Sequence, residues 1–151
     1  MTVLEVLDDP VAQELLNSRE LARLAYTWTD GTPRVVPILF HWTGTELVVA
    51  SPIKAPKVKV LAARPAVAVT IDSSNFPHHV LMIRGEAQVD EIAGIVPEYA
   101  AAAQRYFGTE QANAWLEQLA GMVDGMARIS IVPDHVTILD FETRFPNAIS
   151  A

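Results

Sequence analysis

The stretch Ala50-Ser51-Pro52-Ile53-Lys54-Ala55-Pro56-Lys57-Val58-Lys59-Val60-Leu61-Ala62-Ala63-Arg64-Pro65 holds every lysine of the chain. A helix is expected to begin at Pro56, because proline suits the first helical position, where a missing N–H costs nothing. Pro65 is expected to end it. A strand ending in Ser51 and a helix start bearing lysines predict an anion site, since free N–H groups and the positive end of the helix dipole attract negative charge.

The same lysines also fit a simpler interpretation, in which a short surface helix presents a solvated basic face. The chain carries a formal net charge of -7, so these lysines form a local basic island on an acidic protein. Charge alone does not decide between the two interpretations. If the site is functional, a phosphate group is the ligand that the pattern predicts.

Length and composition restrict the class of protein. The 151 residues predict a single domain, 1–151, and 50% hydrophobic content indicates extensive burial and an apolar subunit interface. No apolar run is long enough for a membrane span, and the N-terminus lacks the order of a signal peptide. The absence of cysteine excludes disulfides and thiolate catalysis and fits a cytoplasmic location. The acidic balance argues against nucleic acid as the main partner.

Outward from the basic stretch, the pattern predicts mostly strands. Asp30-Gly31 is a hairpin signal, Pro37 indicates an edge strand or a bulge, and Gly85 indicates a bulge or a close approach. Asp9 is expected to cap a short helix, and Thr109 to cap the second of two helices separated by Gly108. The expected strands are 22–28, 33–42, 46–50, 66–71, 78–90, 127–132 and 135–141, with an irregular tail at 144–147. Hairpin-linked strands in this number predict a mainly β fold, an antiparallel sheet closed as a small barrel.

In their order along the chain, several segments resemble the pyridoxamine 5'-phosphate oxidase-like, FMN-binding split-barrel family, including its flavin and deazaflavin oxidoreductase branch. The resemblance covers roughly residues 20–145. It rests on Ser51, Lys57, Leu61 and Pro65 at their spacing, on Arg34-Val35-Val36-Pro37-Ile38, on 80–87, on 98–108 and on 140–146. It implies an antiparallel split β-barrel.

The resemblance also implies a set of cofactor-binding residues. The hydroxyl of Ser51, the ammonium group of Lys57 and the guanidinium of Arg34 would face the cofactor phosphate. Val35, Val36 and Pro37 would line the ring, and Lys54 would either reach the same anion or screen it. The oxidase's later cofactor-binding tryptophan and arginine have no clear match, and Phe141 and Arg144 occupy roughly that region. Ala55 and Pro56 stand where the oxidase itself carries serine and arginine. Vitamin B6 oxidation is therefore not implied.

Other candidate chemistry is not supported by the sequence. His78 and His79 are strand neighbours that point to opposite faces, and His41 and His135 lack ligand spacing, so no metal site is expected. No nucleophile-elbow glycine pattern is present, and the catalytic residues remain unassigned. Arg84 is expected to pair with Glu86 or with an anionic ligand.

The expected function is that of a flavin-type oxidoreductase passing hydride to or from a small conjugated substrate. FMN is the default cofactor; coenzyme F420 is the alternative, because its anionic tail would suit Lys54, Lys59 and Arg64. A homodimer is expected, since pairing subunits covers strand edges, and in the family the cofactor lies between subunits. Two other classes stay open: a non-catalytic carrier or sensor of a flavin, haem or bile pigment, and a structural domain with an empty groove.

Overall fold

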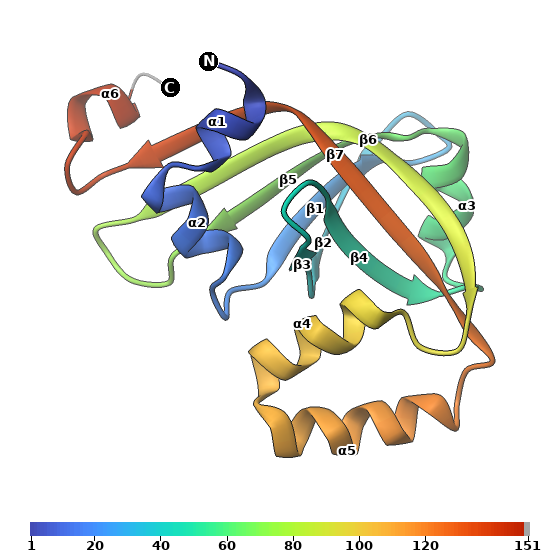
Figure 1. Cartoon of the computed structure of the whole chain (residues 1–151). Helices are drawn as coiled ribbons and strands as arrows, with labels where there is room; N and C mark the ends of the chain where they lie inside the picture. Colours follow the sequence, from blue (N-terminus) through green and yellow to red (C-terminus); the bar gives the residue numbers. More distant parts are fainter. Residues whose placement is uncertain (150–151) are drawn as a thin grey trace.

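The computed structural model describes residues 1–149 and contains a seven-stranded antiparallel sheet and six helices (Figure 1). The strands are β1 (Ala22–Thr27), β2 (Pro33–Ile38), β3 (His41–Trp42), β4 (Leu47–Pro52), β5 (Ala66–Asp72), β6 (His79–Ala93) and β7 (Gly125–Asp140). The helices are α1 (Val3–Leu7), α2 (Pro10–Leu16), α3 (Pro56–Ala63), α4 (Pro97–Phe107), α5 (Thr109–Ala120) and α6 (Phe145–Ile149). No helix within the described range is both long and apolar enough to cross a membrane.

The strand order is β2-β1-β5-β6-β7-β4-β3, so the two edge strands are consecutive in the chain. The extended stretch 33–42 pairs with β1 through its first part and with β4 through its last two residues. It thereby joins the two edges of the sheet, and the predicted antiparallel split β-barrel is confirmed. The prediction of one continuous strand over 33–42 was wrong, because the chain must leave one ladder at Leu39-Phe40 before it enters the other. Pro37 lies on an edge strand, as expected.

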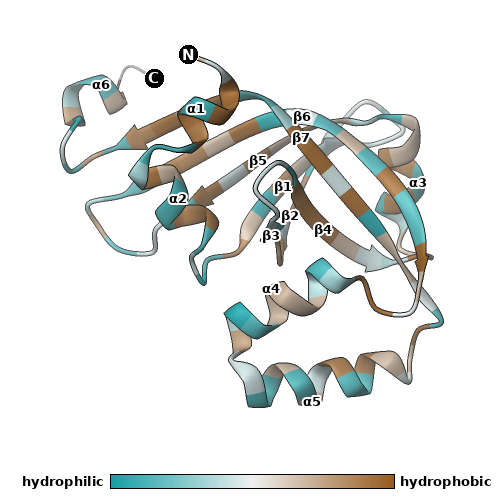
Figure 2. Cartoon of the chain, in the orientation of Figure 1, coloured by the Kyte–Doolittle hydropathy of each residue, from teal (hydrophilic) through white to brown (hydrophobic). Residues whose placement is uncertain are grey.

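Alternating apolar side chains fill the inside of this sheet. Leu24 and Tyr26 point inward from β1, and Leu81 and Ile83 point inward from β6. Figure 2 shows apolar residues along β4 and apolar residues alternating with polar ones along β7. Leu7, Leu15 and Leu16 of α1 and α2 join the same core and are almost completely buried. The N-terminal helices therefore belong to the core.

The two N-terminal helices begin with side-chain caps. The carboxylate of Asp9 accepts a hydrogen bond from the Val11 N–H at 2.9 Å, and Pro10 opens α2, as the sequence predicts. The capping box between Thr2 and Glu5 that starts α1 went unnoticed in the sequence. Thr109 does not cap α5, because Gly108 occupies the cap position and Thr109 is already helical. The tail is not irregular throughout, since 145–149 forms α6.

The strand β7 is continuous, which corrects the expectation of two strands joined at Pro133-Asp134. It pairs with β6 from His79 opposite Asp140 to Ala93 opposite Gly125. The register shifts between Arg84, which faces His135, and Gly85, which faces Pro133. Asp134 is thus the extra residue of a bulge, and the bulge at Gly85 that the sequence indicated is confirmed. Proline and aspartate mark this bulge and not a turn, because β6 offers an uninterrupted partner on the other side.

A half-buried arginine ties the α4–α5 pair to the barrel. The Nε of Arg105 donates to the Ser18 carbonyl at 2.7 Å, and its Nη2 donates to the Phe40 carbonyl. The guanidinium carbon lies 4.8 Å from the centre of the Phe40 ring, and burial lowers the pKa of Arg105. These contacts fix α4 at the point where the chain passes from β2 to β3.

We expect Arg105→Met to destabilise the protein by about 1.5–3 kcal/mol, the range for hydrogen bonds to a charged group, because two carbonyl groups lose their donor. Urea unfolding followed by tryptophan fluorescence measures this change. Arg19→Met is the matched control: Arg19 is exposed and also donates to a backbone carbonyl, that of Tyr106. It should change stability by less than about 0.5 kcal/mol. Equal effects of the two substitutions would contradict the role given to Arg105.

Candidate cofactor-binding site

The passage from β4 to α3 places Ser51 and Lys57 at one end of the barrel. Ser51 is 2% exposed and lies opposite Ala127 of β7. The Ala55 N–H donates to the Pro52 carbonyl at 3.0 Å, which turns the chain into α3. Pro56 is the first helical residue, as predicted, and Ala55 at the cap position provides no side-chain hydrogen bond. The start of α3 therefore lacks the internal acceptor that a serine or aspartate would supply.

Lys57 is partly buried at this helix start. Burial lowers the pKa of its ammonium group, which means that removal from water disfavours the charged form. Within the described part of the chain no carboxylate forms an ion pair with it. A cation held partly out of water beside an uncapped helix N-terminus favours an anionic ligand.

The segment 34–37 lies on the edge strand β2 and is mostly exposed. Val35 is 65% exposed, although its side chain is large and apolar. The guanidinium of Arg34 lies over the Trp28 ring at 5.4 Å and donates to Thr32 Oγ1 and to the Pro33 carbonyl. In this structure Arg34 is thus held by its own hairpin. The outer edge of β2 presents an uncovered surface of the kind that binds a ligand or a second chain.

Lys54 lines a groove of about 350 Å³ beside the β4–α3 loop. The opposite wall is the loop between α5 and β7, which carries Met122, Val123 and Asp124. The groove is lined by Pro52, Ile53, Lys54, Met122, Val123, Asp124 and Gly125. The sequence analysis did not identify this second wall. Its one distinctive residue is Gly125, where the structure leaves no room for a side chain because a Cβ would lie 2.5 Å from the Ile92 carbonyl oxygen.

The other predicted cations lie elsewhere. Arg144 follows β7 and forms ion pairs of 3.5 Å with Asp9 and with Asp140. Figure 1 shows this end of β7 on the opposite side of the molecule from α3. Arg64 donates to the Thr29 carbonyl at 3.1 Å, and Lys59 is exposed. One chain therefore places Ser51, Lys54 and Lys57 on the same β4–α3 connection and leaves Arg144 apart from them.

Arg84 does not form the predicted ion pair with Glu86. Both side chains point to the outer face of β6, where water solvates them, so nothing forces them to pair. Arg84 lines a small hollow of about 190 Å³ on this face, together with His135 and Thr137.

The family model for pyridoxamine 5'-phosphate oxidase matches residues 9–139. The chain belongs to the pyridoxamine 5'-phosphate oxidase family. Members of this family share a flavin-binding split-barrel fold and include oxidoreductases. The match covers β1 to β6, all of β7 except its last residue, and the whole β4–α3 passage.

Several solved structures share the fold of this chain. A conserved hypothetical protein from Mycobacterium tuberculosis is 19% identical with a TM-score of 0.66, covering 94% of this chain and 86% of its own. An F420 reductase is 25% identical with a TM-score of 0.64, covering 83% and 94%. General stress protein 26 from Bacillus anthracis is 16% identical with a TM-score of 0.63, covering 91% and 94%. No curated protein sequence matches the chain.

Proposed function

We propose that this protein is a flavin-type oxidoreductase that binds FMN, with coenzyme F420 as the alternative, in a groove completed by a second copy of the chain. The observation that carries the proposal is the partly buried Lys57, which has no ion-pair partner among the described residues and lies at the uncapped start of α3. A cofactor phosphate supplies the charge that this position lacks. Membership in a flavin-binding family gives the class of cofactor.

Each residue has a distinct role in this proposal. Lys57 neutralises the phosphate, and the Ser51 hydroxyl donates to it. Arg34 joins them by giving up its contact with Thr32. The open edge of β2 offers backbone groups of Val35 and Val36 to the ring, while Pro37 has no N–H and contributes a wall. A bound flavin supplies hydride transfer, and the protein holds, orients and shields the reacting pair from water.

Exposed apolar side chains support a homodimer. Val35 of β2, Met122 of the α5–β7 loop and Val132 of β7 are 65%, 64% and 60% exposed. Large apolar side chains in contact with water are costly, and a second copy of the chain would cover them. The uncovered edge of β2 would be shielded by the same association.

The charges of the groove favour FMN over coenzyme F420. Lys54 lies at the groove, but Asp124 lines the same groove and offsets it. Arg64 is already held by a backbone carbonyl of the β1–β2 hairpin. An anionic oligoglutamate tail would thus find fewer free cations than the sequence suggests. Because the chain is similar to an F420 reductase, F420 should be tested as a ligand alongside FMN.

Titration of the purified full chain with FMN and, separately, with F420 tests the proposal. We expect saturable binding of one FMN per chain, seen as a shifted flavin absorption spectrum and quenched fluorescence. The bound flavin should be reduced by a chemical or nicotinamide donor and reoxidised by an acceptor. A bound flavin that no donor reduces would favour a carrier or sensor, for which haem and a bile pigment would then be titrated. If the protein binds neither cofactor, the alternative of a structural domain with an empty groove would be favoured.

A further inference from the structure

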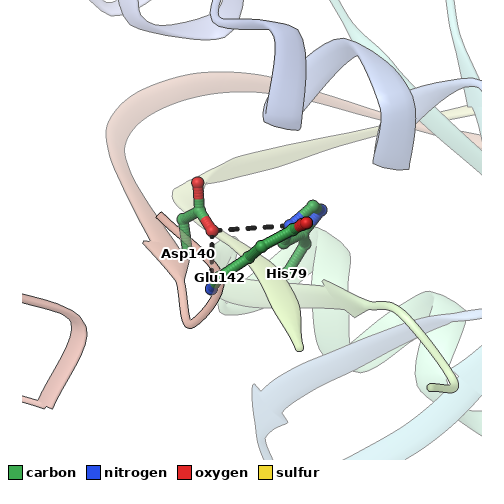
Figure 3. A group of neighbouring side chains, drawn as sticks. All are labelled: His79, Asp140 and Glu142. Carbon is green, nitrogen blue, oxygen red and sulfur yellow. Dashed lines mark hydrogen bonds and ion pairs between the residues drawn. The ribbon is translucent and has the colours of Figure 1, made fainter. Parts of the chain in front are cut away.

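A second polar cluster lies at the opposite end of the barrel from α3. It joins His79 at the start of β6, Asp140 at the end of β7 and Glu142 in the turn that follows (Figure 3). His79 and Asp140 face each other in the sheet register, so the backbone fixes their separation. The side chains of His79 and Asp140 are only 15% and 5% exposed, whereas that of Glu142 is 58% exposed.

The carboxylates of Asp140 and Glu142 converge on one imidazole nitrogen of His79. Nε2 of His79 lies 3.4 Å from Asp140 Oδ1 and 3.1 Å from Glu142 Oε2. In tetrahedral zinc sites the bonds to nitrogen and carboxylate oxygen are about 2.0–2.2 Å long, which separates neighbouring donor atoms by about 3.3 Å. Both measured separations therefore match the edges of such a tetrahedron. The three donor atoms all lie within 4.8 Å of one another, so an ion would bind all three after adjustment of the exposed Glu142 side chain.

The surrounding groups orient the imidazole in the way that metal ligands are oriented. Nδ1 of His79 lies 2.9 Å from Glu14 Oε2 of α2. Without a metal, Nε2 donates its own proton to Glu142 at 3.1 Å. A metal ion would replace that proton, while the Glu14 carboxylate would keep the other proton on Nδ1, as in carboxylate–histidine–metal arrangements.

Neighbouring groups of the turn after β7 hold both oxygens of the Asp140 carboxylate. Its Oδ2 accepts from Thr143 Oγ1 at 2.6 Å and pairs with Arg144 at 3.5 Å, and its Oδ1 accepts from the N–H groups of Glu142 and Thr143 at 2.9 and 3.0 Å. These contacts orient the carboxylate, as supporting hydrogen bonds orient metal ligands.

We propose that His79, Asp140 and Glu142 bind a divalent transition-metal cation such as Zn²⁺ or Co²⁺, with Glu14 as the supporting carboxylate. The imidazole ligand favours these ions over Mg²⁺ and Ca²⁺, which prefer oxygen ligands alone. Three protein ligands leave a fourth position for water. The ion would tie the turn after β7 to the start of β6, and through Glu14 to α2. Sequence spacing does not reveal this set, because His79 and Glu142 are 63 residues apart.

Titration of the full-length protein with Co²⁺ tests this proposal without involving the flavin. We expect one Co²⁺ per chain, with the visible absorption of a four- or five-coordinate nitrogen–oxygen site, displaced by Zn²⁺. Glu142→Gln, at an exposed position, should weaken binding at least 10-fold, and Glu14→Gln by about 10- to 100-fold, the usual loss for a supporting ligand. His79→Gln should abolish the absorption, and Glu142→Gln keeps the test valid if His79→Gln does not fold.

His78→Gln is the matched control, because His78 is the exposed sequence neighbour of His79 and its imidazole ring contacts the Ser73 carbonyl and the Phe76 ring. It should leave Co²⁺ affinity unchanged. Equal loss of affinity in His78→Gln and Glu142→Gln would overturn the proposal, as would binding that neither His79→Gln nor Glu142→Gln alters. So would an NMR spectrum in which both ring nitrogens of His79 stay protonated when Co²⁺ is added, which would identify an ion-pair cluster. FMN titration of Glu142→Gln should match the wild type, so failure at this site leaves the flavin proposal standing.

Discussion

Lys57→Met is expected to weaken FMN binding by about 10- to 150-fold, because a charge-assisted hydrogen bond contributes about 1.5–3 kcal/mol. The methionine side chain keeps most of the apolar stem but removes the positive charge at the start of α3. Isothermal titration or flavin fluorescence measures the change in Kd. Lys59→Met is the matched control, since Lys59 is exposed and lies only two residues away on the same helix. Similar losses in the two variants would mean that general surface charge, and not a phosphate site, attracts the flavin.

The same substitution should leave the empty protein at least as stable as the wild type. Burial lowers the pKa of Lys57 from the ordinary value of 10.5, so the charged form is disfavoured in the folded state. Between the lowered pKa and 10.5 the unfolded chain binds more protons, and the wild type should gain stability as pH rises through this window. Lys57→Met should lack that gain. A residue retained at a cost to stability is what a binding site requires.

Much of the fold follows from local signals that the structure confirms. Pro56 and Pro65 mark α3 at both ends, and Asp30-Gly31 forms the hairpin between β1 and β2. These signals act within a few residues, since proline restricts its own φ and its neighbour, and Gly31 adopts a positive φ of 84°. The strand period of 22–28 is equally local. Such features can be predicted from the sequence because they depend little on residues far away in the chain.

The features that sequence reasoning missed depend on distant partners. The long strand β7 continues through Pro133-Asp134 only because β6 absorbs the irregularity at Gly85. The break at Leu39-Phe40 arises because 33–42 must pair with strands on both edges of the sheet. Neither partner is visible in a local window. Turn residues can thus mark a bulge when a continuous strand lies beside them.

The same division holds for the candidate site. Ser51 and Lys57 were predicted because their spacing around the strand-to-helix passage is local, and the structure places both on that passage. The wall formed by 122–125 comes from more than sixty residues farther along the chain and has no motif of its own. Arg144 belongs to the predicted set of cofactor-binding residues, but within one chain it lies beyond the end of β7, on the opposite side of the molecule from α3. If Arg144 takes part in the proposed site, a second copy of the chain has to bring it there.

Gly85→Ala is expected to have the largest effect on stability, because the bulge leaves no room for a side chain. A Cβ at this position would lie 2.5 Å from the Val132 carbonyl oxygen and 3.1 Å from a methyl group of Ile131. The first contact is with backbone, so relief requires β7 to move away from β6. Overpacking of this kind costs about 1–3 kcal/mol, and we expect a value at the upper end. In a chain of this size that lowers Tm by about 4–12 °C.

Gly121→Ala is the matched control for thermal and urea unfolding. Gly121 has φ −77°, which any residue adopts, and a Cβ there would meet only the Gln118 carbonyl at an ordinary 3.5 Å. It should be neutral or stabilise by up to about 1 kcal/mol. If Gly85→Ala unfolds like Gly121→Ala, then β7 can shift at the bulge at little cost, and its 16 residues are not held in one register. If it is strongly destabilised, the bulge is what allows a single strand to carry both the wall beside Ser51 and the Asp140 cluster at its far end.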